Sequence, residues 1–161
     1  MPFGGMVQVL GGLATDKATS AEGVHRLGTL GAWYMSPDGQ TLLRLVQNGD
    51  GSALTQYAAV AWKNPAAGTV SVTGTTAARD PQLAGVVQSA IAASGFGFIA
   101  VSGITEALAA AAVTIDTNIE IDGTDGKWDD SAADAADMKN AWAVDTGVAD
   151  TQFTILLKGL L

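Results

Sequence analysis

Apolar and polar residues alternate over several short segments of the chain, and this alternation predicts β-strands. The clearest case is "TIDTNIEID" (114–122), where every second residue from Ile115 to Ile121 shares one face and acidic or amide side chains occupy the other. The segments "GTVSVTGTT" (68–76) and "TQFTILLKG" (151–159) repeat the pattern. Because successive side chains of a strand point to opposite faces, each of these segments should bury one face.

Turn-forming sequences flank two further apolar runs. "SPDG" (36–39) precedes the run Leu42–Gln47, and "NGDG" (48–51) separates that run from "LTQYAAVAW" (54–62). Proline and glycine at these positions favour tight turns, and we expect the two glycines of "NGDG" to provide left-handed backbone geometry. Turn, strand, turn and strand in so short a stretch predict antiparallel β structure.

Two other segments admit more than one interpretation. In "RDPQLAGVVQSAIAAS" (79–94), Asp80 can cap a helix, Pro81 suits its first turn and the apolar residues have helical spacing, so that periodicity favours a helix without deciding the matter. The alanine-rich "SAADAADMKNAW" (131–142) predicts a short helix. Residues 1–32 lack a long periodic pattern and are expected to form an extended arm. The expected fold class is therefore mainly β: an antiparallel barrel or sandwich-like body, an N-terminal arm and at most one or two short helices.

The composition of the 161-residue chain fits one domain with a core of small side chains. Apolar residues make up 48% of the sequence, aromatic residues only 6%, and there are 20 glycines. The chain has no cysteine, which excludes disulfides, thiol nucleophiles and thiolate metal sites. The N-terminal "MPFGGMVQVLGG" has neither a basic start nor a long apolar core, so we expect no secretion signal.

The net charge of −8 is concentrated in one segment. Ten acidic residues lie between Asp116 and Asp150, against Lys127 and Lys139, and the charges of the remaining chain cancel. Binding to duplex nucleic acid requires clustered lysine and arginine, and no such cluster is present. We therefore expect no direct contact with nucleic acid and an acidic, solvated insertion at about 122–140.

The most apolar part of the sequence, Leu83–Val113, does not predict a membrane span. Glycine, serine, glutamine, threonine and glutamate interrupt it, whereas a spanning helix needs about 20 consecutive, mostly apolar residues. No membrane partner is expected.

Within that window, "GFGFIAVSGITEAL" (95–108) predicts a strand that is apolar on both faces. Two phenylalanines occupy one face and two aliphatic residues the other, so both faces need cover. We expect the strand to lie in the interior or at an oligomer interface formed by the four residues Phe96, Phe98, Ile99 and Val101.

No catalytic constellation emerges from the sequence. His25 is the only histidine, lies in "EGVHRLG" and has no G-x-S-x-G motif to accompany it. One histidine and no cysteine leave an almost purely carboxylate set, which is unusual for zinc. "GFGF" lacks the spacing of phosphate-binding loops, and no pair of carboxylates is singled out for glycoside hydrolysis. The expectation is a protein that is not an enzyme and holds no cofactor.

The acidic "IDGTDGKWDD" does not fit a calcium loop. With Asp122 in the first position, Thr124, Gly126 and Ala133 stand where oxygen ligands or the bidentate glutamate would be required. A solvated loop is the better interpretation than an adventitious cation site, so no metal site is expected.

Four segments, taken in order, resemble tailed-bacteriophage head decoration (cement) proteins. They are "VQVLGGLATDKATSAEGVHRLGTLGAW", "SPDGQTLLRLVQNGDGSALTQYAAVAW", "LAGVVQSAIAASGFGFIAVSGITEAL" and "AWAVDTGVADTQFTILLKG". The resemblance spans most of the chain through short, degenerate motifs. The acidic stretch from Asp122 to Lys139 has no counterpart in it.

The resemblance implies a small, often trimeric β-rich protein that is made in the host cytoplasm and sits on the outer surface of an icosahedral head. There it would bind the major capsid protein and stabilise contacts between capsid subunits. Residues 1–32 would be the docking arm and 33–161 the decoration domain, and 83–108 would be a strand, a turn and a second strand. The arm residues implied to contact the capsid are Val24, His25, Arg26 and Leu27.

Two other classes remain as alternatives. One is a phage fibre, spike or receptor-binding module that recognises a host glycan or protein through Trp128 and the acidic loop. The other is a small hydrolase that uses His25 as its base.

Overall fold

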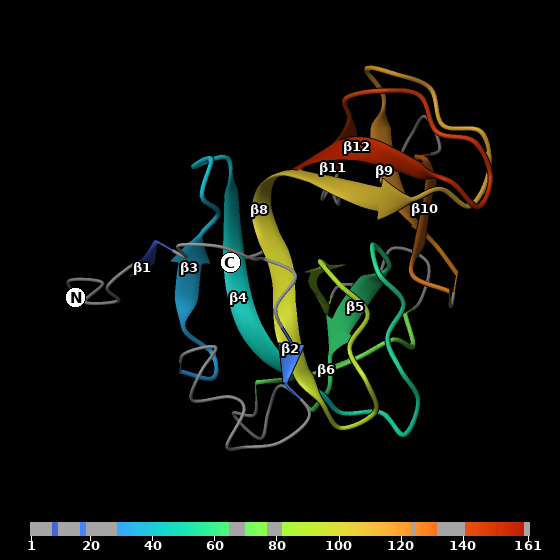
Figure 1. Cartoon of the computed structure of the whole chain (residues 1–161). Helices are drawn as coiled ribbons and strands as arrows, with labels where there is room; N and C mark the ends of the chain where they lie inside the picture. Colours follow the sequence, from blue (N-terminus) through green and yellow to red (C-terminus); the bar gives the residue numbers. More distant parts are fainter. Residues whose placement is uncertain are drawn as a thin grey trace.

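In the computed structural model, the described part of the chain consists of strands and turns, without helices (Figure 1). The described residues are 8–9, 17–18, 29–64, 70–76, 82–123, 125–131 and 141–159. The strands are β1 (Gln8–Val9), β2 (Lys17–Ala18), β3 (Trp33–Met35), β4 (Thr41–Asn48), β5 (Ala59–Trp62), β6 (Ser71–Thr73), β7 (Leu83–Val87), β8 (Phe96–Leu108), β9 (Asn118–Asp122), β10 (Lys127–Asp130), β11 (Ala141–Ala143) and β12 (Gln152–Leu157). Within these ranges no helix is long and apolar enough to cross a membrane.

Five strands close into a barrel in the order β4, β6, β5, β7 and β8. Closure follows from pairing between β4 and β8, which runs antiparallel from Thr41 opposite Gly103 to Gln47 opposite Phe96. β4 and β6 pair in parallel, while the other pairs of the barrel are antiparallel. The expected mainly β barrel is confirmed.

The C-terminal half of β8 is also the first strand of a second sheet. There β8 pairs with β12, and the sheet continues through β11 and β9 to β10. In Figure 1 the long yellow β8 rises through the barrel and then curves into this second sheet, beside the red β12. One strand thus belongs to both parts of the fold.

The change of partner on β8 takes place at Gly103. This residue pairs with Thr41 on one side and with Leu157 on the other, and its φ of 96° lies in the left-handed region that favours glycine. A Cβ at this position would collide with the carbonyl oxygen of Gln40, which accepts a hydrogen bond from Ile104 N at 3.3 Å. The bend that joins barrel and sheet therefore requires glycine.

Two apolar clusters lie on opposite faces of β8. Every barrel strand contributes to the first cluster, which identifies it as the barrel interior; its members are Val46, Leu54, Val60, Val72, Ala84, Val87, Ile91, Ile99 and Val101. The second cluster joins side chains on the outer wall of the barrel, Phe96 and Phe98 among them, to the second sheet. The expectation that β8 is apolar on both faces is confirmed, and one chain covers both faces.

The helical interpretation of 79–94 is wrong for its described residues. Leu83–Val87 is the fully buried strand β7, and Ile91 forms an isolated bridge with Leu54. Leu83 and Val86 of β7 belong to one cluster and Ala84 and Val87 to the other, so both faces of the strand are packed and tertiary packing overrides the helical spacing. The strand–turn–strand alternative for 83–108 is confirmed.

Other sequence expectations are confirmed in part. Gly39 of "SPDG" has a φ of 73°, and Phe153, Ile155 and Leu157 of β12 are buried. Neither glycine of "NGDG" has a positive φ; the buried Asn48 amide organises this loop by donating to the carbonyls of Ser52, Ile91 and Ala92.

The strand expected at 114–122 begins later than the alternation suggests. Ile115 is 47% exposed and Asp116 has a φ of 63°, so these residues form a turn, and only Ile119 and Ile121 are buried in β9. The segment 54–62 is interrupted in the same way by Tyr57, whose φ is 64°, and the strand is Ala59–Trp62.

Little of the expected arm and of the second ambiguous segment belongs to the described residues. Of residues 1–32, β1 pairs in parallel with β3, and β2 pairs with β8. Residues 132–140 lie outside the described ranges, and the end of the expected helix, Ala141–Trp142, belongs to strand β11. The acidic insertion begins as the antiparallel pair β9–β10.

Replacing Gly103 with alanine should destabilise the protein by about 3 kcal/mol, because a left-handed backbone and a collision with Gln40 combine. The matched control is Gly39→Ala, which has a similar φ of 73° but nothing within 4 Å of the new Cβ, and it should cost about 1 kcal/mol. Urea unfolding of both variants measures the difference. Equal losses would show that β8 does not depend on the close approach at Gly103.

Candidate interaction surface

The outward face of the second sheet carries a group of apolar side chains, which we call the apolar row: Ile104, Leu156, Trp142 and Val144. Strand register places Ile104 opposite Leu156, and Leu156 opposite Trp142. Of the six large apolar side chains that are exposed in the described part of the chain, three lie on this face: Ile104 at 41%, Leu156 at 40% and Val144 at 40%. Contiguous exposed apolar side chains are typical of surfaces that bind a partner.

Polar contacts hold the apolar row in place. Lys158 Nζ lies 5.5 Å from the centroid of the Trp142 ring and donates to Asn118 Oδ1 at 3.1 Å. Thr154 Oγ1 donates to Asp145 Oδ2 at 2.9 Å and also lies 3.3 Å from Glu106 Oε1, so that its single proton is shared between the two carboxylates. These contacts give the apolar row a charged rim, the arrangement that protein interfaces commonly have.

A second surface feature lies where β3, β4 and β5 approach one another. The guanidinium carbon of Arg44 is 4.6 Å from the ring centroid of Trp33 and 4.9 Å from that of Trp62. All three side chains are partly exposed, and burial lowers the pKa of Arg44 below its usual value. We call this group the Arg44 sandwich.

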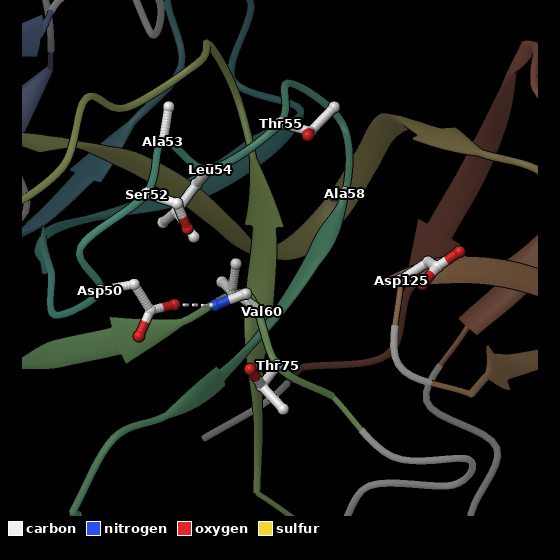
Figure 2. Close-up of a pocket in the computed structure, with 10 residues that line it drawn as sticks. Asp50, Ser52, Ala53, Leu54, Thr55, Ala58, Val60, Thr75 and Asp125 are labelled. Carbon is white, nitrogen blue, oxygen red and sulfur yellow. Dashed lines mark hydrogen bonds between the residues drawn. The ribbon is translucent and has the colours of Figure 1, made fainter.

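The pocket drawn in Figure 2 has a volume of about 220 Å³ and lies between the "NGDG" loop, the end of β6 and the turn before β10. Asp50 and Asp125 lie on opposite sides of it. Ligand pockets commonly measure about 300 Å³ or more, so this hollow is small for a substrate.

The carboxylate of Asp50 is engaged in holding the loop. Its Oδ1 forms an ion pair with Lys63 Nζ at 3.1 Å, and its Oδ2 accepts from Thr73 Oγ1 at 2.9 Å and from Gly74 N at 2.8 Å. Burial would raise its pKa, but these hydrogen bonds and the lysine outweigh burial, so that the pKa is lowered. The role that the geometry gives Asp50 is structural.

The acidic residues of the β9–β10 region also brace turns. Asp130 accepts from Thr114 N at 3.0 Å, Thr114 Oγ1 at 2.9 Å and Thr117 Oγ1 at 2.8 Å; burial opposes this, yet the pKa of Asp130 is lowered. Asp129 and Asp130 are successive residues of a strand, so their side chains point to opposite faces. Among the described residues no three histidine, cysteine or acidic side chains converge as metal ligands would.

Trp128 is not available for the contact that the receptor-binding alternative would assign to it. It is fully buried in the cluster between the barrel and the second sheet. Among the described residues its Nε1 has no hydrogen-bond partner. A receptor could not touch this side chain without opening the core.

The residues expected to form an oligomer interface are interior residues of one chain. Phe96 is 9% exposed, Phe98 1%, and Ile99 and Val101 0%. The same chain already buries them, so the need to cover an apolar face is no longer a reason to place these residues at an interface. The expected capsid contacts Val24, His25, Arg26 and Leu27 lie outside the described residues.

Sequence reasoning missed the apolar row and the Arg44 sandwich, although the sequence holds a signal for the first. Leu156 has the same parity as the outward Gln152 and Thr154 in "TQFTILLKG", and an apolar residue at an outward position indicates a contact surface. Arg44 alternates with Leu43 and Leu45, but its two tryptophans come from other strands, and their approach cannot be read from spacing.

Solved structures include proteins with a fold similar to that of this chain. The crystal structure of the head fiber gp8.5 N base of bacteriophage phi29 matches with a TM-score of 0.51 and 10% sequence identity, over 72% of this chain and 94% of that chain. At this identity the likeness shows a shared fold. No protein-family model matches the chain, and no curated protein matches it significantly.

Changing Asp50 to asparagine should lower the free energy of unfolding by about 1–2 kcal/mol at pH 7, because the ion pair with Lys63 is lost. The folded-state pKa of Asp50 is lowered, so its contribution is present above the unfolded value of about 3.9 and disappears as the pH falls through the folded value. Denaturant titrations of both proteins between pH 7 and pH 2 measure this difference.

The matched control is Asp125→Asn on the other side of the same pocket. The Asp125 side chain is 68% exposed, and its replacement should change stability by less than about 0.5 kcal/mol. A gap between wild type and Asp50→Asn that stays constant down to pH 2 would refute the clamp role of Asp50.

Proposed function

We propose that this chain is a virion structural protein of a tailed bacteriophage, and that it decorates the outer surface of the head. The observation that carries the proposal is the fold shared with the base of a phage head fiber, which covers 94% of that chain. The ordered resemblance of four sequence segments to head decoration proteins points to the same class independently. The likeness in fold supports the broad class, and the sequence resemblance supports decoration.

The proposed activity is binding, without catalysis. Two partly buried carboxylates, Asp50 and Asp130, have their oxygens engaged by lysine, threonine and backbone donors. A head under internal pressure from DNA is stabilised by many repeated contacts across its subunit boundaries, and multivalency makes weak contacts sufficient.

We assign the main contact with the major capsid protein to the apolar row. It is exposed, lies on a hydrogen-bonded sheet and has a polar rim, whereas the buried apolar side chains of the second sheet belong to the core. The proposal includes a homotrimer on the head surface, as the resemblance implies, with the N-terminal arm as an additional contact. It assigns the protein to the virion and gives it no nucleic-acid or membrane partner.

A second candidate function is the base of a head fibre, because the protein with the shared fold is the base of one. Mass spectrometry of purified virions separates the two candidates. A fibre base would be recovered in the same polypeptide as a projecting fibre segment, while a decoration protein would be recovered without such a segment.

Glutamate in place of Leu156 or Ile104 should weaken binding to purified heads by about tenfold or more, since each change places a charge in an apolar contact, at a cost of ~1.4 kcal/mol or more. The measurement is co-sedimentation of the purified protein with expanded heads over a range of concentrations. Both residues are already exposed, so the variants should fold with unchanged thermal midpoints.

The matched control is Val148→Glu. Val148 is 63% exposed but lies in the turn between β11 and β12, away from the apolar row. It should bind heads like the wild type. If all three variants bind heads as the wild type does, the contact does not involve the apolar row. If the wild type does not bind heads, the proposed function is refuted.

A further inference from the structure

In the Arg44 sandwich, the guanidinium group of Arg44 is held near the surface by two tryptophan rings. Arg44 lies on β4, directly opposite Trp33 of β3, and its guanidinium carbon is also within 4.9 Å of the ring centroid of Trp62 of β5. Arg44 Nε donates to the carbonyl oxygen of Gly31 at 3.2 Å, which fixes the rotation of the group. Figure 1 shows β3 and β4 side by side at the edge of the barrel.

Most of the hydrogen-bonding capacity of Arg44 is unused. A guanidinium has five N–H donors, and within the described structure only Nε has a protein acceptor. No described carboxylate forms an ion pair with it, although the chain has 16 acidic residues, and burial is the sole cause of its lowered pKa. The two terminal amino groups therefore remain available to an outside acceptor.

We propose that the Arg44 sandwich binds a carboxylate, the side chain of an aspartate or glutamate on the surface of a partner protein. The planar fork of arginine matches a carboxylate with two parallel hydrogen bonds. The two indole rings hold the fork in place before binding, so that little side-chain entropy is lost, and they offer apolar surface to the residues beside the carboxylate. Arginine and tryptophan are also the residue types that most often dominate interface energies.

The charge balance favours a protein carboxylate over a polyanion. A chain with a net charge of −8 repels an extended phosphate backbone, whereas one carboxylate within a mixed protein surface experiences a much smaller repulsion. The inference rests on the proposed function only in naming the major capsid protein as the partner. Under that proposal, the Arg44 sandwich is a polar contact point that is separate from the apolar row.

The direct test is an NMR titration of the ¹⁵N-labelled protein with the peptide acetyl-Leu-Glu-Leu-amide, and with its glutamine counterpart as the control ligand. The glutamate peptide should shift the Arg44 Nε–H signal and the indole N–H signals of Trp33 and Trp62 in a saturable manner. The glutamine peptide should bind about tenfold more weakly, because the charge-assisted fork is lost. Equal shifts with both peptides, or none with either, would overturn the inference.

Inorganic phosphate is a third ligand in the same titration. Tighter binding of phosphate than of the glutamate peptide would assign the Arg44 sandwich to a phosphate group and contradict the proposal.

The variant Arg44→Lys keeps the positive charge and loses the planar fork, so its affinity for the glutamate peptide should be about tenfold lower. Arg44→Gln should abolish the difference between the glutamate and glutamine peptides. The comparison of ligands on the unaltered protein stands even if a variant fails to fold.

Head binding separates this inference from the proposed function. Reduced co-sedimentation of Arg44→Lys with heads, alongside lost peptide binding, supports both. If the wild-type protein binds the glutamate peptide but not heads, the carboxylate site is supported and the capsid is excluded as its partner. Unchanged head binding by Arg44→Lys refutes the capsid carboxylate as its ligand and leaves the decoration function intact.

Discussion

The structure depends on a single strand that must be covered on both faces. The first six residues of β8, Phe96–Val101, are all buried, so the strand is stable only where apolar surface meets it from two sides. The barrel interior provides one cover, and the second sheet with the outer wall of the barrel provides the other. The bend at Gly103 makes this possible, because it lets the same strand continue as the first member of the sheet that helps to cover it.

The unusual composition follows from this arrangement. A five-stranded barrel has a narrow interior, and it is filled by alanine, valine, leucine and isoleucine, in agreement with the low aromatic content. Gly97 faces this interior, where a Cβ would lie 2.7 Å from Ile91 Cγ1. The larger aromatic residues Phe98, Phe153 and Trp128 gather outside the barrel, under the second sheet, where more volume is available.

The sequence predicted the fold class and several strands, because alternation is a local signal. The residues of β12 and the apolar strand β8 follow from their patterns, whereas the residues of β7 have helical spacing and only the resemblance to decoration proteins implied a strand there. The bend at Gly103 could not be predicted, since the requirement for glycine comes from Gln40, 63 positions away. The same holds for the candidate surfaces: alternation separates two faces of a strand but does not say which face a second sheet will cover, and Trp33, Arg44 and Trp62 meet only through tertiary structure.

If the chain decorates phage heads through the apolar row, one measurement tests this most directly: an electron cryo-microscopy reconstruction of DNA-filled heads carrying the protein. We expect density at repeated positions on the outer surface, into which the barrel and second sheet fit with Ile104, Leu156 and Trp142 against the shell. Density confined to the tail, or decorated heads in which this face points to solvent, would contradict it.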